Sequence, residues 1–193
     1  ETFKFFGNYT FLKAEIPSSL DSVDYIDNPR EAAFIWKQAN GGERNRKITA
    51  GAAYEAHIGK HISQVTSFFA NHRDSEEIRP FNILKELSLS KGLRTEWIYD
   101  NSAIFKNLFS AFQFHIGGEI FNEDYDWQTY DTDGLGNRRD LISDNKEQRY
   151  NYNFFSQLKF DLNYKATFTA GINYNHTFYE SEDFYIQDGD QSG

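Results

Sequence analysis

The residues best suited to bind a metal lie in one acidic segment and one pair of histidines. The segment Asp131-Thr-Asp-Gly-Leu-Gly-Asn137 places oxygen ligands at alternating positions, as calcium-binding loops do. However, Leu135 and Ile142 occupy the fifth and twelfth positions, where such loops need oxygen, so the segment predicts a plain acidic turn. His57 and His61 flank a predicted turn, but two imidazoles without a third ligand make a poor zinc site. We therefore expect no metal and no cofactor.

Residues for catalysis form no recognisable motif. The sequence has no Gly-x-Ser-x-Gly segment, no His-Glu-x-x-His segment and no phosphate-binding glycine loop. We therefore expect no enzyme. The remaining possibility is that arginine and aromatic side chains bind a ligand, because guanidinium groups bind anions and aromatic rings stack on ligands. The candidates are Arg73, Arg79, Trp127, Tyr130, Arg138 and Arg139, and the alternative for each charge is a solvated loop position.

The segment 147–179, which must position some of these residues, alternates at period two over an unusual length. From Tyr150 to Leu162 the even positions are mainly apolar and the odd positions are mainly polar, and the pattern resumes after a predicted turn. Such alternation places one face in an apolar medium and the other in a polar one. Strands of soluble proteins are about 5–6 residues long, whereas a tilted strand needs about 9–11 to cross a bilayer. The length predicts the wall of an outer-membrane barrel.

Five further strands follow the same pattern, and the connections between strands are predicted to alternate in length. The predicted strands cover about 2–14, 46–58, 61–75, 92–103 and 109–127, followed by the hairpin over 147–179. Tight turns are predicted at 59–60, 106–107 and 163–164, and long polar connections at 15–45, 76–91 and 128–146. Short turns on one side and long loops on the other are typical of membrane barrels. The adjacent Phe68 and Phe69 predict a bulge or a partly covered face.

One short helix is predicted in the first long connection. Asn28 is placed as its N-cap, Pro29 at the first helical position and Glu31 in a capping box, and Gly41–Gly42 ends it. We expect it to pack on the surface of the loop.

Composition fits a wall with two different faces. The chain has 193 residues, 18% aromatic residues, no Cys and a net charge of −9, yet its mean hydropathy is polar at −0.71. An aromatic face toward lipid and a polar face toward water reconcile these values. No run of 18 apolar residues occurs, so membrane-spanning helices are excluded, and the acidic balance argues against a nucleic-acid partner. The alternative is a soluble β-barrel or sandwich that binds a carbohydrate or lipid.

The predicted fold is all-β, an antiparallel up-and-down meander of about seven long strands. Bacterial single-chain barrels close with an even number of strands, so we expect residues 1–193 to be a fragment with open edges near Phe3–Phe11 and Phe168–Phe178. The residues expected to face lipid are Phe112, Phe114, Ile116, Phe154, Leu158, Phe160, Phe168 and Ile172.

The sequence resembles the TonB-dependent outer-membrane receptors, which import ferric siderophores and other scarce nutrients. The likeness rests on Asn28-Pro-Arg-Glu-Ala-Ala-Phe-Ile-Trp36, Arg79-Pro-Phe-Asn-Ile83, Gly117-Gly-Glu-Ile-Phe-Asn-Glu-Asp-Tyr-Asp-Trp127 and the hairpin Tyr150–Tyr179. It implies an internal part of a 22-stranded barrel in the cell outer membrane of a Gram-negative bacterium. The implied partners are outer-membrane lipid, a small-molecule ligand such as a ferric siderophore, and the TonB complex acting through a plug domain outside this chain.

Overall fold

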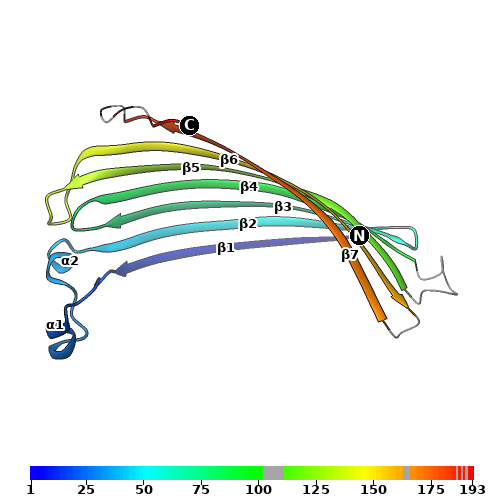
Figure 1. Ribbon diagram of the computed structural model, residues 1–193, viewed down its shortest axis with the longest axis horizontal. Coiled ribbons are helices and arrows are strands. Elements are labelled where there is room, and N and C mark those ends of the chain that lie inside the picture. Colours follow the sequence, from blue (N-terminus) through cyan, green and yellow to red (C-terminus); the bar gives the residue numbers. More distant parts are fainter. Residues whose placement is uncertain (102–110, 163–165, 186, 188, 190) are drawn as a thin grey trace.

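Long antiparallel strands form one sheet in the computed structural model, which describes residues 1–101, 111–162, 166–185, 187, 189 and 191–193 (Figure 1). Within these residues there are seven strands, and each pairs antiparallel with the next in chain order. The strands are β1 (Thr2–Glu15), β2 (Gly42–Ile58), β3 (Ile62–Ile78), β4 (Ile83–Asp100), β5 (Ala111–Thr132), β6 (Arg138–Leu162) and β7 (Ala166–Asp183). The predicted all-β meander is confirmed, and so are its edges, β1 and β7.

The register places the residues expected to face lipid on one face of the sheet, the apolar face. Phe112 pairs with Phe160, and Phe160 with Phe168, while Phe114 pairs with Leu158. Their apolar neighbours form a continuous band, the apolar belt. The belt covers 3–11 on β1, 48–58 on β2, 62–70 on β3, 93–99 on β4, 112–120 on β5, 150–160 on β6 and 168–178 on β7. On six strands the belt covers 9–11 residues, about the number that a bilayer crossing requires, and on β4 it covers seven.

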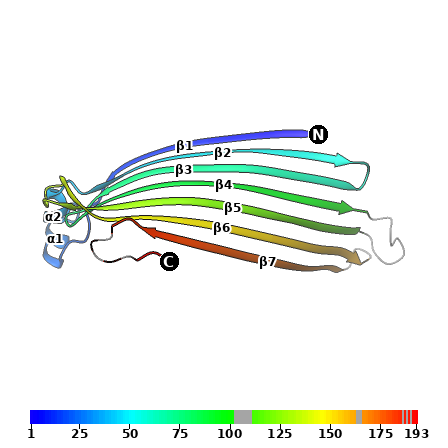
Figure 2. The same ribbon diagram turned by 90° about the horizontal axis from the view of Figure 1, so that it is seen from above.

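The sheet is a single layer with almost no core (Figure 2). Among the described residues the buried apolar side chains are Ala39, Ala56 and Ile83. On the apolar face, by contrast, Ile172 is 76% exposed, Phe154 55% and Ile116 50%. A patch of this size is far larger than a soluble monomer exposes, so the apolar face needs lipid or another protein against it.

The two ends of the sheet differ in what connects the strands. The predicted turn at 59–60 is confirmed between β2 and β3, where Gly59 adopts a φ of 68°, a conformation that glycine accepts without strain. The turns predicted at 106–107 and 163–164 lie outside the described residues.

At the opposite end two predicted long connections are wrong. Most of 76–91 and 128–146 is strand, so the connections shrink to 79–82 and 133–137, and the strict alternation of short and long connections is lost. The error at 76–91 has a physical cause: charged residues such as Glu76, Lys85 and Lys91 lie on the apolar-face register there, so side-chain alternation weakens although the backbones still pair. The connection 16–41 is the one long connection at this end within the described residues.

Of the two alternatives predicted at Phe68 and Phe69, the bulge is wrong, whereas a partly covered face agrees with the half-buried Phe69. Both residues pair in continuous register, with Phe68 on the apolar face and Phe69 on the opposite, polar face. The irregularities of the sheet lie instead in β5, between Thr129 and Tyr130 and between Tyr130 and Thr132. Phe69 therefore fits the polar face without a bulge.

The connection 16–41 contains two short helices, α1 (Ser22–Asp27) and α2 (Phe34–Gln38), where one helix starting at Asn28 was predicted. Asp21 caps α1, because its carboxylate accepts the backbone N–H groups of Val23 and Asp24 at 2.8 Å each. Asn28 ends α1 rather than starting a helix, and its side chain donates to Glu31. Neither helix combines the length and the apolar character that a membrane crossing would require.

Candidate ligand-binding surface

The polar face carries aligned rows of hydrogen-bonding side chains at the point where the strands leave the apolar belt. One row runs across Thr49, Asn71, Ser90, Glu123 and Arg149, and the next across Lys47, Arg73, Ser88, Tyr125 and Glu147. Together they form a depression of about 430 Å³, the polar depression. Its lining is Lys47, Asn71, Arg73, Ser88, Ser90, Glu123, Tyr125 and Arg149.

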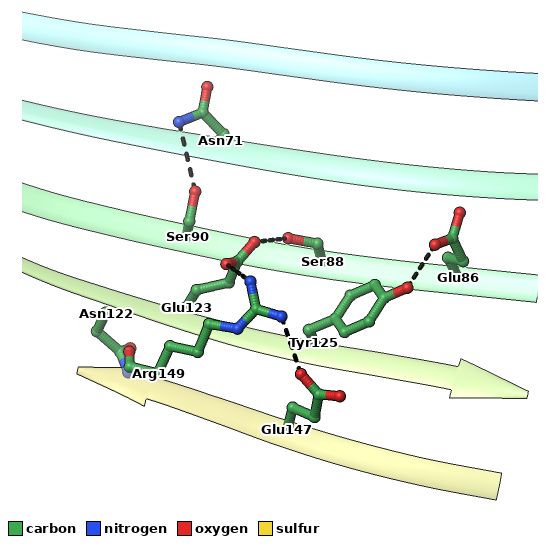
Figure 3. Close-up of polar contacts among 9 residues, drawn as sticks. All are labelled: Asn71, Glu86, Ser88, Ser90, Asn122, Glu123, Tyr125, Glu147 and Arg149. Carbon is green, nitrogen blue, oxygen red and sulfur yellow. Dashed lines mark hydrogen bonds and ion pairs between the residues drawn. The ribbon is translucent and has the colours of Figure 1, made fainter. Parts of the chain in front are cut away.

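Arg149 on β6 links the two rows (Figure 3). Its Nη2 donates to Glu147 Oε2 at 2.9 Å, and its Nη1 lies 3.4 Å from Glu123 Oε2. Ser88 on β4 donates to the other oxygen of Glu123 at 2.8 Å. The guanidinium group also lies over the ring of Tyr179, 5.7 Å from its centre. These contacts hold Arg149 flat against the sheet.

Glu86 on β4 connects Arg73 and Tyr125, two residues that line the polar depression. Its carboxylate accepts the hydroxyl of Tyr125 and forms an ion pair with Arg73. The residues before and after Tyr125 are Asp124 and Asp126, which lie on the apolar-face register. Because both are charged, this part of β5 lies beyond the apolar belt. Partial burial, followed by the hydrogen bond to Glu86, raises the pKa of the Tyr125 phenol, which therefore stays protonated at neutral pH.

The polar depression contains hydrogen-bond donors that no described protein group satisfies. The Nε atoms of Arg73 and Arg149 are buried and have no hydrogen-bond partner among the residues that the structure describes. Lys47 lines the same depression and has no ion pair within the described part of the chain. Unsatisfied buried donors are unfavourable, and an oxygen-rich anion or water placed here would satisfy them. Arg73 and Arg149 are three strands apart, or roughly 14 Å at the usual spacing, so one ligand of moderate size could contact both.

A row of alternating phenylalanine and glycine borders the polar depression on its belt side. Across five neighbouring strands it contains Phe6, Gly51, Phe69, Gly92 and Phe121. The rings lie over the glycines: a Cβ on Gly92 would be 2.2 Å from Phe69 Cζ, and one on Gly51 would be 2.2 Å from Phe6 Cε1. This Phe–Gly row gives the polar face a flat aromatic border.

The structure places three of the predicted contact residues along the polar face of β3–β5 and the other three at a hairpin tip. Arg73 lines the polar depression, Trp127 lies in the row containing Glu86, and Arg79 donates to Glu77 at 2.5 Å on the same face. The tip holds the remaining three: Arg138 lies over the ring of Tyr130 at 4.5 Å, and Arg139 follows it. The sequence did not identify Lys47, Tyr125 or Arg149, although the odd register of the hairpin at 147–179 already placed Arg149 on the polar face.

The acidic segment 131–137 forms a turn organised by one carboxylate. Asp133 accepts the backbone N–H groups of Leu135 at 2.8 Å and Asn137 at 3.1 Å, and the side-chain amide of Asn137 at 2.7 Å. These bonds, led by the one from the Asn137 side chain, lower the pKa of Asp133. No group of three or more His, Asp or Glu residues suited to a metal occurs in the ranges that the structure describes.

This arrangement predicts a pH dependence for the turn at 131–137. Because the folded pKa of Asp133 is lowered, its stabilising effect is fully present above the ordinary value of about 3.9 and is lost as the pH falls through the folded value. We expect the backbone amide signal of Leu135 in an NMR titration to move with a midpoint below about 3.9. Asp133→Asn should abolish that transition, and a midpoint at or above the ordinary value would contradict the assignment.

Comparison with known proteins gives the class of the sheet. No model of a known protein family matches the chain. Among solved structures, the chain is similar to the unliganded form of the ferric citrate transporter FecA, with a TM-score of 0.76 and 14% sequence identity. The match covers 94% of this chain and 28% of the transporter chain, so the chain spans little more than a quarter of that protein. The fold of the chain is therefore similar to that of part of this transporter, in agreement with the fold that the resemblance in sequence implied.

Proposed function

We propose that this chain is part of the wall of a 22-stranded outer-membrane transporter that imports a scarce nutrient with energy from the TonB complex. One observation carries the proposal: a single-layer sheet exposes an apolar belt on one face and charged, hydrogen-bonding rows on the other. Lipid suits the first face and a water-filled lumen suits the second. The TonB complex would act through a plug domain outside residues 1–193.

The proposed substrate is an anionic ferric chelate such as a ferric siderophore. The polar depression offers the guanidinium groups of Arg73 and Arg149, the ammonium group of Lys47 and the hydroxyls of Ser88 and Ser90. Guanidinium groups bind carboxylates with two parallel hydrogen bonds. Because Glu86, Glu123 and Glu147 already hold the two arginines, a bound anion would exchange with these carboxylates rather than meet free cations. Because these carboxylates can take the place of the anion again, such exchange would help the substrate to leave the site.

A binding experiment on the chain refolded in detergent tests this assignment. Ferric citrate and a series of ferric siderophores of different charge would be titrated while Trp fluorescence is followed. We expect anionic complexes to bind more tightly than neutral ones and to weaken as salt is added. Arg149→Gln should weaken the anionic complexes by roughly tenfold or more, because it removes a charged hydrogen-bond donor.

Arg139→Gln is the matched control, since it removes the same charge at the exposed hairpin tip. Equal weakening by the two variants, or equal affinity for neutral and anionic complexes, would contradict the assignment. Sedimentation without detergent tests the wall itself, and we expect self-association. A monomer that binds no hydrophobic dye would contradict the membrane wall and would favour a soluble module that binds a carbohydrate or lipid.

A further inference from the structure

The charged groups of the polar depression balance one another before any ligand binds. Its cations are Lys47, Arg73 and Arg149. The carboxylates that pair with the two arginines are Glu86, Glu123 and Glu147. Three positive charges therefore meet three negative ones. An anion that enters this site adds a surplus negative charge unless a positive charge enters with it.

The entering anion competes with Glu86 for Arg73. Glu86 accepts a hydrogen bond from Nη2 of Arg73, while Nε of the same guanidinium group has no partner among the described residues. A ligand oxyanion can accept from Nε and Nη2 together, in the two-bond geometry that strengthens such pairs. Lys47 pairs in register with Arg73 on the neighbouring strand and adds a second cation. The ligand therefore gains by displacing Glu86 from Arg73.

Of the three carboxylates, Glu86 is the least able to remain charged without its cation. Its side chain is 17% exposed, compared with 22% for Glu123 and 30% for Glu147. After the loss of Arg73 it keeps the hydrogen bond from the hydroxyl of Tyr125 (Figure 3). A largely buried carboxylate with no cation beside it favours its protonated, neutral form.

The other groups that face Glu86 do not replace Arg73. Arg79 and Glu77 lie on the β3 side of Glu86, but Arg79 is already paired with Glu77 at 2.5 Å. On its other side β5 contributes Tyr125 and Trp127, which carry no charge at neutral pH. Its neighbours on the polar face of β4 and β3 are likewise uncharged: Leu84, Ser88 and Ser75.

We infer that the polar depression binds an anion together with one proton, the anion on Arg73 and the proton on Glu86. The proton comes from solvent and forms the O–H bond of the Glu86 carboxyl group, and no other covalent bond forms or breaks. For a singly charged anion the filled site is again neutral. The inference rests on the proposed function, because it requires the polar depression to be the anion site. Since binding takes up a proton, affinity rises as the pH falls, by at most about tenfold per pH unit.

Titration calorimetry of the chain refolded in detergent tests this coupling. The probes are sulfate and benzenesulfonate, whose own charges do not change between mildly acidic and neutral pH. We expect both to bind roughly tenfold more tightly at mildly acidic pH than at neutral pH. Repeating the titration in buffers of different ionisation enthalpy counts the protons, and we expect about one to be taken up for each anion bound.

Three variants assign the proton to its residue. Glu86→Gln imitates the protonated carboxyl group, so at neutral pH it should bind both probes more tightly, by about tenfold, and it should lose the pH dependence and the proton uptake. Tyr125→Phe removes the donor that stays with the displaced carboxylate, so the rise in affinity should begin at higher pH. Glu119→Gln is the matched control, because Glu119 lies on the same face, 3.9 Å from Arg94 and outside the depression, and it should keep both properties.

The outcomes separate this coupling from the anion site itself. Binding without pH dependence in the original chain, persistent pH dependence in Glu86→Gln, or equal changes in Glu86→Gln and Glu119→Gln would overturn the coupled proton alone. An unchanged transition in Tyr125→Phe would overturn its assignment to Glu86. Failure of the original chain to bind the probes or ferric citrate at any pH would contradict the proposed anion site as well. Circular dichroism checks folding, and if Glu86→Gln does not fold, the proton count of the original chain decides.

Discussion

Arginine in place of Ile172 is expected to lower the free energy of unfolding in a bilayer by about 2–4 kcal/mol, the cost of a cation on the lipid face near the midplane. Ile172 lies near the middle of the apolar belt on β7, opposite Ser156. Arginine at Ile116 should have a similar effect because it occupies the same row. Denaturant unfolding of the chain refolded in lipid vesicles measures the change.

The neighbouring residue of the same strand provides the control. Asn173 follows Ile172 on β7, lies on the polar face and is exposed. Asn173→Arg should therefore change stability by less than about 0.5 kcal/mol, as exposed substitutions do. If Asn173→Arg were the more damaging of the two, the two faces would be reversed with respect to lipid.

Alanine at Gly92 is expected to destabilise the sheet by about 1–3 kcal/mol, the usual cost of overpacking. The added Cβ would lie 2.2 Å, 2.6 Å and 2.9 Å from three ring atoms of Phe69. The ring cannot move freely, because Phe121 lies beside it with ring centres 6.3 Å apart. The same unfolding experiment measures the loss.

A double-mutant cycle identifies the cause of that loss. In a Phe69→Ala background the ring is gone, so Gly92→Ala should cost little or nothing, which gives a coupling energy of about 1 kcal/mol or more. Gly7→Ala is the control glycine substitution, because its Cβ would meet no atom closer than 4.0 Å. An equal loss at Gly7 would point to backbone effects and against the Phe–Gly row.

The sequence predicted strands well where the two faces differ in polarity. The hairpin at 147–179 and the strand at 109–127 alternate strongly, and both were placed correctly. Residues 76–91 were misread as a loop because Glu76 and Lys85 lie on the apolar-face register and interrupt the alternation that Leu87 and Leu89 continue. Pairing there depends on backbone hydrogen bonds to β3 and β5, which a side-chain pattern does not record.

The polar depression was only partly predictable for a different reason. Arg73 was found because arginine alone suggests anion binding, but Arg149 is held by Glu123 on β5 and Glu147 in its own strand, and Glu123 is held in turn by Ser88 on β4. These contacts depend on the register of several strands, and each strand contributes one polar residue among many. A single sequence therefore identifies the face but not which positions of neighbouring strands become adjacent.

The continuous pairing beyond the apolar belt has a consequence for motion. β6 contains 25 residues, or about 85 Å of extended chain, while the hydrocarbon core is about 30 Å thick. The protruding parts of β5 and β6 are therefore a hydrogen-bonded ribbon, which moves collectively in microseconds or longer rather than in the nanoseconds of a free loop. At the same end of the wall, the connection 16–41 lacks continuous strand pairing and can therefore rearrange faster. The β5–β6 ribbon and the connection 16–41 would thus respond to a ligand on separate timescales.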